Sequence, residues 1–270
     1  GDFVWSAWDY LGEACIGDWT YHSYKGLPLL AGQGMIDITG KPLASMYFMQ
    51  IVWGLRKEPF IGVRPLNHAK EAPSTGAWQF TNAVDSWSWQ GFEGEKAVVE
   101  VYADAAAVRL SLNGKENGTK PVKKYKVMFK LPYQPGTLLA ESLDVNGKVI
   151  SRHSLTTAGK ETVLTAIPET TALRANGQDL CYLPIEFTDM AGNLKPYIEQ
   201  RVDIEVEGTV SLAGFGSALC KTDEVFGKPY HDSYRGRCLA VLRVGDTPGV
   251  AKIVIKSAGV KPVTIEVEVK

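Results

Sequence analysis

Hydrophobic and polar residues alternate one by one over much of the chain after about residue 78. Val108, Leu110 and Leu112 alternate with polar neighbours up to Asn113-Gly114, and residues 125–131 follow the same pattern. A two-residue period puts the apolar side chains on one face of a β-strand, and Asn-Gly between such runs is typical of a hairpin turn. The pattern therefore predicts half-buried strands joined by tight turns.

Similar runs continue to the C-terminus. A second Asn-Gly, at Asn146-Gly147, joins residues 138–145 to residues 148–155 and predicts another hairpin. Further strands are expected at 163–168, 182–189, 201–206, 209–214, 238–244, 250–256 and 262–269. Short strands at this spacing predict immunoglobulin-like β-sandwiches, which need about seven strands each. We therefore expect two sandwiches, over 78–159 and 160–270, after a linker over 61–77.

The first 60 residues follow a different pattern. Residues 1–10 predict a buried strand, and residues 11–41 are glycine-rich and irregular. After Pro42, apolar residues recur every three or four positions, which predicts a helix that ends near Lys57. We therefore expect a mainly β protein in which one β/α unit, over 1–60, precedes the sandwiches. Because each sandwich has its own alternating strands, we expect residues 78–270 to fold without residues 1–60.

Composition narrows the class of protein and its partners. The 270 residues are 45% hydrophobic and 22% charged, with a formal net charge of −1, as in a globular protein. Nucleic acids and anionic membranes attract an excess of basic residues, so we expect neither as a partner. No apolar run reaches the length of about 18 residues that a membrane span needs.

The cysteines do not form a disulfide scaffold. They are scattered, and no two of them make a CxxC motif. Their number is even, so a single bridge, such as Cys220–Cys238, stays open. The four are Cys15, Cys181, Cys220 and Cys238.

Several segments resemble a known family. Phe3-Val4-Trp5, followed by Asp9-Tyr10-Leu11-Gly12-Glu13, is similar to the last barrel strand of glycoside hydrolase family 2, the β-galactosidase family. Residues 34–42 and 47–53 resemble the turn and the closing helix that come next in that family. Trp87-Ser88-Trp89 is similar to the first immunoglobulin-like domain after the barrel, and residues 189–193 and 214–217 to the final one. The resemblance implies the last unit of a (β/α)8 barrel and two immunoglobulin-like domains.

The resemblance also implies a retaining glycoside hydrolase. Such enzymes use two carboxyl groups about 5–5.5 Å apart, as nucleophile and as acid/base. In this family they belong to the fourth and seventh barrel strands, so we expect both before Gly1 and none within this chain. Asp9 and Glu13 would share a face only on a helix, and this segment is predicted as strand and loop. We therefore expect Asp9 and Glu13 to serve as a salt bridge or cap, and this chain alone to be inactive.

Trp5 is the candidate substrate-binding residue. A flat indole at the C-terminal end of a barrel strand suits the C–H face of a sugar ring, and the family resemblance supports this role. The alternative is a tryptophan packed under the closing layer of the barrel. For Trp8 we expect packing. The loop aromatics are expected to pack on one another, with a place at the rim of the sugar site as the alternative; they are Trp19, Tyr21, His22 and Tyr24.

The remaining motifs predict structure more than chemistry. The histidines are scattered singly, so we expect no metal site, and no glycine-rich phosphate loop or other cofactor motif is present. Asp223-Glu224 with His231-Asp232 lacks calcium-loop spacing, and residues 120–126 are interpreted as a polar strand edge. Trp87 and Trp89 share a strand face, which favours core or interdomain packing over a sugar-binding strip. The histidines are His22, His68, His153 and His231.

Two functions follow from these observations. The first is the C-terminal part of a β-galactosidase-type hydrolase, with a β-galactoside or related glycan and the preceding part of the polypeptide as its partners. The second is a stand-alone carbohydrate-binding or adhesive module. The opening β/α unit favours the first, because a binding module does not need one. The compartment stays open, with a bacterial periplasmic or secreted location favoured.

Overall fold

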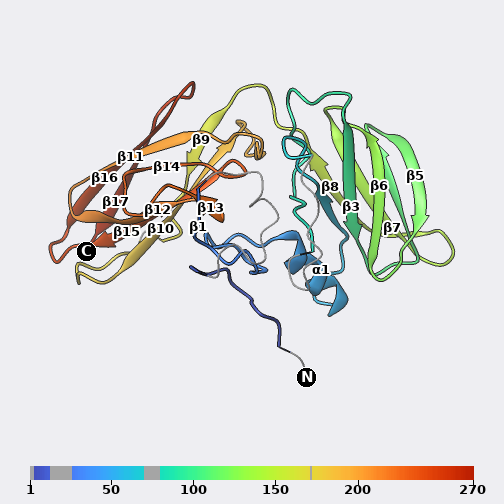
Figure 1. The fold of residues 1–270 in the computed structure, drawn as a ribbon, viewed down its shortest axis with the longest axis horizontal. Coiled ribbons are helices and arrows are strands. Elements are labelled where there is room, and N and C mark those ends of the chain that lie inside the picture. The colour runs from blue at the N-terminus through green and yellow to red at the C-terminus, as the bar shows by residue number, and fades with distance from the viewer. Residues whose placement is uncertain (1–2, 13–25, 70–79, 171) are drawn as a thin grey trace. The chain divides into compact units, whose positions relative to one another are not determined.

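The computed structural model describes residues 3–12, 26–69, 80–170 and 172–270 (Figure 1). Its contacts divide the chain into two units. The first consists of Gly1–Ala158 with Cys220–Thr222, and the second of Gly159–Leu219 with Asp223–Lys270. The described residues are mainly β, with one short helix before two sandwiches, which confirms the predicted fold class. No helix among the described residues is long and apolar enough to span a membrane.

The helix of the first unit, α1 (Ala44–Val52), is shorter than the predicted one. Leu43 occupies its N-cap without a side-chain hydrogen bond. Gly54 adopts the left-handed conformation, with a φ of +69°, and its N–H donates to the oxygen of Ile51 at 3.0 Å. A glycine in this conformation ends a helix by satisfying its last carbonyls, which is why the helix stops before Lys57.

Residues 3–12 form an extended segment in place of the regular strand predicted over 1–10. The N–H of Asp9 donates to the oxygen of Ile36 at 2.8 Å, and the N–H of Ile36 donates to the oxygen of Ala7 at 2.9 Å. Beyond Asp9 the partners change, and the N–H of Ala31 donates to the oxygen of Tyr10 at 3.0 Å. Each partner pairs over only a few residues, so no continuous ladder forms among the described residues.

Two sheets of three and four strands make the first sandwich. Their strand orders are β2-β3-β6 and β5-β4-β7-β8, and every pair is antiparallel. The strands are β2 (Phe60–Val63), β3 (Lys96–Tyr102), β4 (Ala107–Leu112), β5 (Lys115–Pro121), β6 (Lys126–Pro132), β7 (Thr137–Leu143) and β8 (Val149–Thr156). β2 is fully buried and begins before the predicted linker, so the first sandwich starts earlier than the hairpin pattern indicated.

The second sandwich has two four-stranded sheets, ordered β12-β15-β10-β9 and β14-β11-β16-β17. Its strands are β9 (Val163–Ala166), β10 (Leu180–Thr188), β11 (Arg201–Glu207), β12 (Val210–Gly216), β14 (Tyr230–Asp232), β15 (Arg237–Val244), β16 (Gly249–Ser257) and β17 (Val263–Val269). A separate two-stranded sheet in the first unit pairs β1 (Leu27–Pro28) with β13 (Lys221–Thr222).

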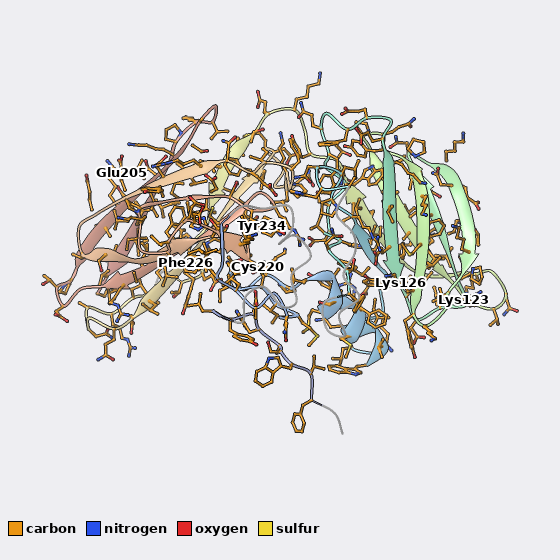
Figure 2. All side chains as sticks on the ribbon, viewed as in Figure 1. Lys123, Lys126, Glu205, Cys220, Phe226 and Tyr234 are labelled. Atoms are coloured by element: carbon orange, nitrogen blue, oxygen red, sulfur yellow. The ribbon has the colours of Figure 1, made fainter. Side chains whose placement is uncertain are left out.

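Alternation along the strands builds each core, as the period-2 pattern predicts. In β4 every second residue is buried, and in the second unit the inward-facing residues of both sheets form one cluster. The glycine-rich end of β12 has a steric cause, because a β-carbon on Gly216 would overlap the ring of Phe226, which Figure 2 labels. The N–H of Phe215 also donates to the oxygen of Phe226, at 2.7 Å. The loop after β12 therefore packs on the strand itself.

The three described cysteines are buried thiols and form no disulfide. They are Cys181, Cys220 and Cys238. The Cys220–Cys238 bridge that the sequence left open is therefore not formed. Burial raises the pKa of the Cys238 thiol well above its usual range, so this thiol behaves as a small core residue.

Candidate functional site

Trp5 presents its indole to solvent from the extended opening segment. The side chain is 59% exposed, so it is not packed under a closing layer within this chain. Its Nε1 donates to the hydroxyl oxygen of Tyr10 at 2.8 Å, and the two rings meet edge to face with centroids 6.2 Å apart. This contact fixes one edge of the indole and leaves an apolar ring available for contact with a ligand.

Asp9 anchors this segment to the following loop. Its Oδ1 accepts a hydrogen bond from the N–H of Gly32 at 2.9 Å, and its side chain is buried. Burial raises the pKa of Asp9, and hydrogen bonds from the backbone of Tyr10, Gly32 and Gln33 partly oppose that rise. A carboxylate held by loop N–H groups has a positioning role, as the predicted cap implies. Glu13, the other member of the predicted pair, lies outside the described residues.

Trp8 lies against the turn that follows. Its ring is 3.4 Å from the position that a β-carbon on Gly40 would occupy, although the side chain is still 53% exposed. Oδ1 of Asp37 organises that turn by accepting from the N–H of Thr39 at 2.9 Å and from the N–H of Lys41 at 3.1 Å. The contact agrees with the packing role expected for Trp8.

The candidate site, as far as the structure describes it, consists of Trp5 and Tyr10, with Asp9 holding the segment. Tyr10 is the residue that sequence reasoning missed. It was part of the recognised motif, but nothing in the local pattern indicated that its hydroxyl would meet an indole five residues earlier. The loop aromatics Trp19, Tyr21, His22 and Tyr24 lie outside the described residues, so their predicted packing on one another, and the alternative place at the rim, stay untested.

Other sequence candidates are engaged in structural contacts. Both carboxylate oxygens of Glu224 accept from the N–H of Asp232 at 3.0 Å, and Oε2 lies 3.2 Å from Nδ1 of His231. These contacts close the loop between β13 and β14. Within the described part of the chain, no group of three or more His, Cys, Asp or Glu side chains is placed to hold a metal ion.

Trp87 and Trp89 are core residues of the first sandwich. Both are fully buried, and Nε1 of Trp87 donates to the oxygen of Gln134 at 2.9 Å. Trp87 also meets the ring of Tyr133 edge to face at 5.0 Å. Neither indole offers a face to a sugar, which excludes the alternative of a sugar-binding strip on this strand.

Two sequence profiles match the two sandwiches. Residues 164–266 match the profile described as Glycoside hydrolase family 2 C-terminal domain 5. Residues 94–151 match a domain of unknown function, DUF4982. Over 99% of its length the chain is also 26% identical to a β-galactosidase of Bacteroides ovatus. The chain resembles the C-terminal part of glycoside hydrolase family 2 enzymes.

Solved structures extend this likeness to family 2 across both units. A family 2 glycosyl hydrolase from Bacteroides cellulosilyticus matches 100% of the chain with a TM-score of 0.85 and 28% identity. A second structure, from B. cellulosilyticus DSM 14838, matches 99% with a TM-score of 0.81 and 27% identity. A putative β-glucuronidase of Formosa agariphila is 30% identical over 78% of the chain. These relatives confirm the predicted resemblance to the C-terminal part of family 2 hydrolases.

The chain is much shorter than these relatives. It covers 28% of the B. ovatus β-galactosidase and 18% of the putative β-glucuronidase. It covers 36% and 34% of the two solved B. cellulosilyticus chains. The matched relatives are glycoside hydrolases in which the equivalent of this chain is one part among others.

Proposed function

We propose that this chain is the accessory C-terminal part of a retaining β-galactosidase-type hydrolase. The observation that carries the proposal is the family 2 likeness, which extends over the whole chain and includes the segment that bears Trp5. The two sandwiches support the barrel, and the opening segment helps to shape its sugar site. The bond-breaking chemistry belongs to carboxylates outside these 270 residues.

Trp5 contributes to substrate binding in this proposal. A sugar ring presents a C–H face, and an indole offers a matching flat apolar surface. As a retaining glycosidase reaches its oxocarbenium-like transition state, the sugar distorts, and a platform fitted to the distorted ring lowers the barrier. The hydrogen bond to Tyr10 holds the indole at one orientation, so the platform is ordered before substrate arrives. Asp9 keeps the segment in place through Gly32.

Trp5→Ala in the whole enzyme that carries this chain tests the proposal. We expect kcat/KM for a nitrophenyl β-galactoside to fall about ten- to a hundredfold, equivalent to about 1–3 kcal/mol of transition-state stabilisation. Because this role places the indole at the sugar site and not in a core, the melting temperature is expected to change little. A lower melting temperature with unchanged kcat/KM would make Trp5 a packing residue. Nitrophenyl β-glucuronide, measured in parallel, tests the sugar class that the second relative suggests.

The isolated chain gives a second test. We expect it to hydrolyse no nitrophenyl β-galactoside, because in this proposal the nucleophile and the acid/base lie outside these 270 residues and the carboxylate of Asp9 is committed to the backbone of Gly32. Asp9→Asn and Glu13→Gln serve as the matched variants. Turnover that survives both substitutions would indicate a contaminating enzyme, whereas turnover abolished by either would overturn the accessory role.

A further inference from the structure

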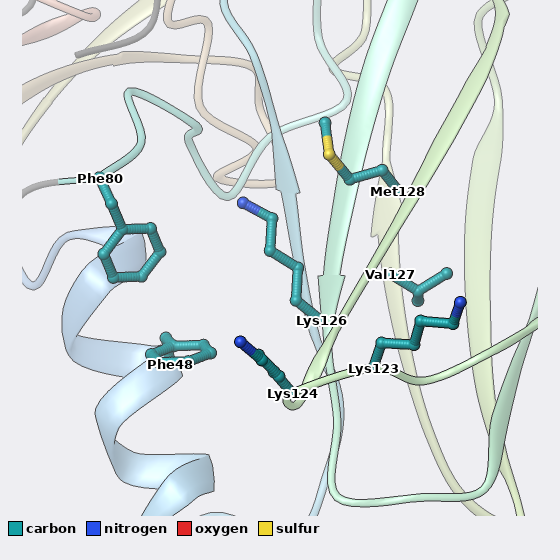
Figure 3. A pocket seen from close by; sticks show the side chains of 7 residues that line it. All are labelled: Phe48, Phe80, Lys123, Lys124, Lys126, Val127 and Met128. Atoms are coloured by element: carbon teal, nitrogen blue, oxygen red, sulfur yellow. The ribbon is translucent and has the colours of Figure 1, made fainter. Parts of the chain in front are cut away.

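A cavity of about 410 Å³ in the first unit is unrelated to the opening segment. It lies between α1, the segment before Trp87, and the hairpin that leads into β6 (Figure 3). We call it the lysine–phenylalanine cavity. The side chains that define it are Phe48, Phe80, Met128, Lys123, Lys124 and Lys126. Ligand pockets in proteins span about 300–1,000 Å³, so this volume suits a small organic molecule.

One wall of the cavity is aromatic. Phe48 and Phe80 meet edge to face, with ring centroids 5.1 Å apart. Phe48 also packs on the buried ring of Tyr102 at 5.3 Å, which fixes its position on α1. Both phenyl groups are nevertheless only half-buried. A rigid, incompletely covered aromatic wall is a suitable surface for a flat apolar group.

The facing wall is cationic. Figure 3 shows Lys124 and Lys126 reaching toward the two phenyl rings, while the amine of Lys123 points away from them. Nζ of Lys126 is 2.6 Å from Oε2 of the buried Glu100 and 5.5 Å from the centroid of Phe80. No described residue forms an ion pair with Lys124. The cavity is therefore largely apolar, with the amines of Lys124 and Lys126 beside its aromatic wall.

The turn that carries Lys124 is conformationally costly. Lys123 and Lys126 exchange two backbone hydrogen bonds, of 3.2 and 3.0 Å, which leaves Lys124 and Tyr125 as a two-residue hairpin loop. Their φ angles are +49° and +61°. Left-handed geometry at both positions strongly favours Asn-Gly, the pair that the chain uses at Asn113-Gly114. A strained non-glycine turn that places a lysine at a cavity points to a role for that lysine.

The chemistry of the lining selects the ligand. Among the described residues that line the cavity, no side chain carries an oxygen, so these side chains offer hydrogen-bond donors and apolar surface but no strong acceptors. Each hydroxyl of a neutral sugar donates one hydrogen bond and accepts others. Its O–H groups would find no side-chain acceptor among these residues. We propose that the lysine–phenylalanine cavity binds an aromatic carboxylate, with its ring on Phe48 and Phe80 and its carboxylate on the ammonium group of Lys124, because the ammonium group of Lys126 is already paired with Glu100. An engineered cavity of about 150 Å³ holds benzene, so the volume also admits a short carboxylate arm.

Titration of the 270-residue chain with cinnamate tests the proposal. Calorimetry and NMR of the Met128 methyl group are expected to report saturable binding at one site. Lys124→Gln is expected to weaken binding about tenfold or more, because a charge-assisted hydrogen bond is lost. Lys130→Gln is the matched control, since Lys130 is an exposed lysine on β6, the strand that follows the hairpin loop, and does not line the cavity. Cinnamamide, which keeps the ring but lacks the charge, is expected to bind at least tenfold more weakly.

A second variant separates binding from folding. Lys124→Asn with Tyr125→Gly installs the favoured turn, so we expect a higher melting temperature together with lost cinnamate binding. The absence of saturable binding to the unsubstituted chain would overturn the proposal. Equal weakening by Lys124→Gln and Lys130→Gln would overturn the assigned site. If galactose or glucuronate binds as tightly as cinnamate, and cinnamate displaces it, the proposal that the ligand is an aromatic carboxylate would be overturned.

Discussion

The carboxylate of Asp189 accepts four hydrogen bonds in the second unit, and Asp189→Asn measures what they contribute. Oδ1 accepts from the backbone N–H groups of Ala191 and Asn193, both at 2.9 Å. Oδ2 accepts from the N–H of Gly159 at 2.6 Å and from Nδ2 of Asn193 at 3.0 Å. The side chain thus joins the turn after β10 to the first residue of its unit.

The free energy can be worked from the pKa of this group. Burial alone would raise the pKa of Asp189, but hydrogen bonds from Asn193, Gly159 and Ala191 outweigh it and lower the pKa from 3.8 to about 2. At about 1.36 kcal/mol per pKa unit, the ionised carboxylate contributes about 2 kcal/mol to folding at pH 7. In Asp189→Asn an amide NH2 group replaces one of the two oxygens. That NH2 group then faces N–H groups that had donated to the carboxylate, so these hydrogen bonds are lost. We expect a loss of about 2–3 kcal/mol at pH 7.

The sign of the pH dependence is fixed by the direction of the shift. A lowered folded-state pKa gives stability that is present above pH 4 and is lost as the pH falls toward 2. The contribution of Asp189 should therefore fall to about half by pH 3. All seven tryptophans precede residue 90, so their fluorescence reports on the first unit alone. Hydrogen exchange in β10 and β15 reports on the second unit and is the appropriate assay.

Asp144→Asn is the matched control. Asp144 stands at an equivalent turn in the first unit, but both of its backbone hydrogen bonds, from Asn146 and Lys148 at 2.9 Å, fall on Oδ1. Asparagine keeps that oxygen, so we expect the free energy of unfolding to fall by less than about 1 kcal/mol. Tryptophan fluorescence measures the unfolding of this unit. A loss at Asp189 that is the same at pH 7 and pH 3, or is no larger than the loss at Asp144, would refute the reasoning.

Three further substitutions test the cores. Glu100→Gln is expected to destabilise the first unit by about 3 kcal/mol at pH 7 in fluorescence-monitored unfolding, because Lys126 loses a buried counter-charge. Burial opposes the lowering of the Glu100 pKa, but the ion pair and hydrogen bonds outweigh it. The loss of stability should therefore shrink below pH 4.5, where the carboxyl becomes protonated in the unfolded chain. Lys195→Met should lower the free energy of unfolding of the second unit, measured by hydrogen exchange, by about 2–3 kcal/mol. The Nζ of Lys195 donates to the backbone oxygens of Lys160 and Glu161 and to the hydroxyl of Thr162, and all three would lose that donor. Trp87→Ala should lower the free energy of unfolding, measured in urea, by about 3–5 kcal/mol, because the indole is fully buried. For any of the three variants, a loss of stability below about 1 kcal/mol would contradict the structural role given to that residue.

The sequence predicted those strands whose own residues alternate, and it missed strands defined by their partners. β4, β7 and β17 lie where the two-residue period placed them. β5 is polar and almost wholly exposed, so nothing in its pattern distinguishes it from a loop, and its structure comes from pairing with β4. β2 is a short apolar run that the sequence pattern groups with the linker because Pro65 and Pro73 follow it, and its ladder to β3 decides its state.

The candidate sites divide in the same way. Trp5 could be named from a local motif, whereas its contact with Tyr10 depends on how the segment bends. The lysine–phenylalanine cavity joins residues 48, 80 and 123–128, and no local pattern predicts that these segments meet. The hairpin at residues 124–125 was also missed, because neither lysine nor tyrosine is a residue that left-handed turns favour. Tertiary contacts, and not propensity, hold it.

The expectation that residues 78–270 fold alone conflicts with the core of the first unit. Ile51 of α1 and Phe60 of β2 belong to one buried cluster with Tyr102 of β3. The rings of Phe60 and Tyr102 stack at 5.8 Å, and β2 supplies ladder hydrogen bonds to one edge of β3. A chain that begins at residue 76 loses both elements. It would expose the buried side of β3 and leave its N–H and C=O groups without these partners.

Three shortened chains that begin at residues 40, 57 and 76 test this argument. The first keeps α1 and β2, the second keeps only β2, and the third keeps neither. Phe60, Ile61 and Val63 are almost fully buried, and at about 1.5–3 kcal/mol per side chain their loss approaches the 5–15 kcal/mol that stabilises a whole domain. We expect cooperative tryptophan-fluorescence unfolding from residue 40, a lower midpoint from 57 and no cooperative transition from 76. Hydrogen-exchange protection in β10 and β15 should persist in all three, and a cooperative transition from 76 at the midpoint of the full chain would contradict the assignment of β2 to the core.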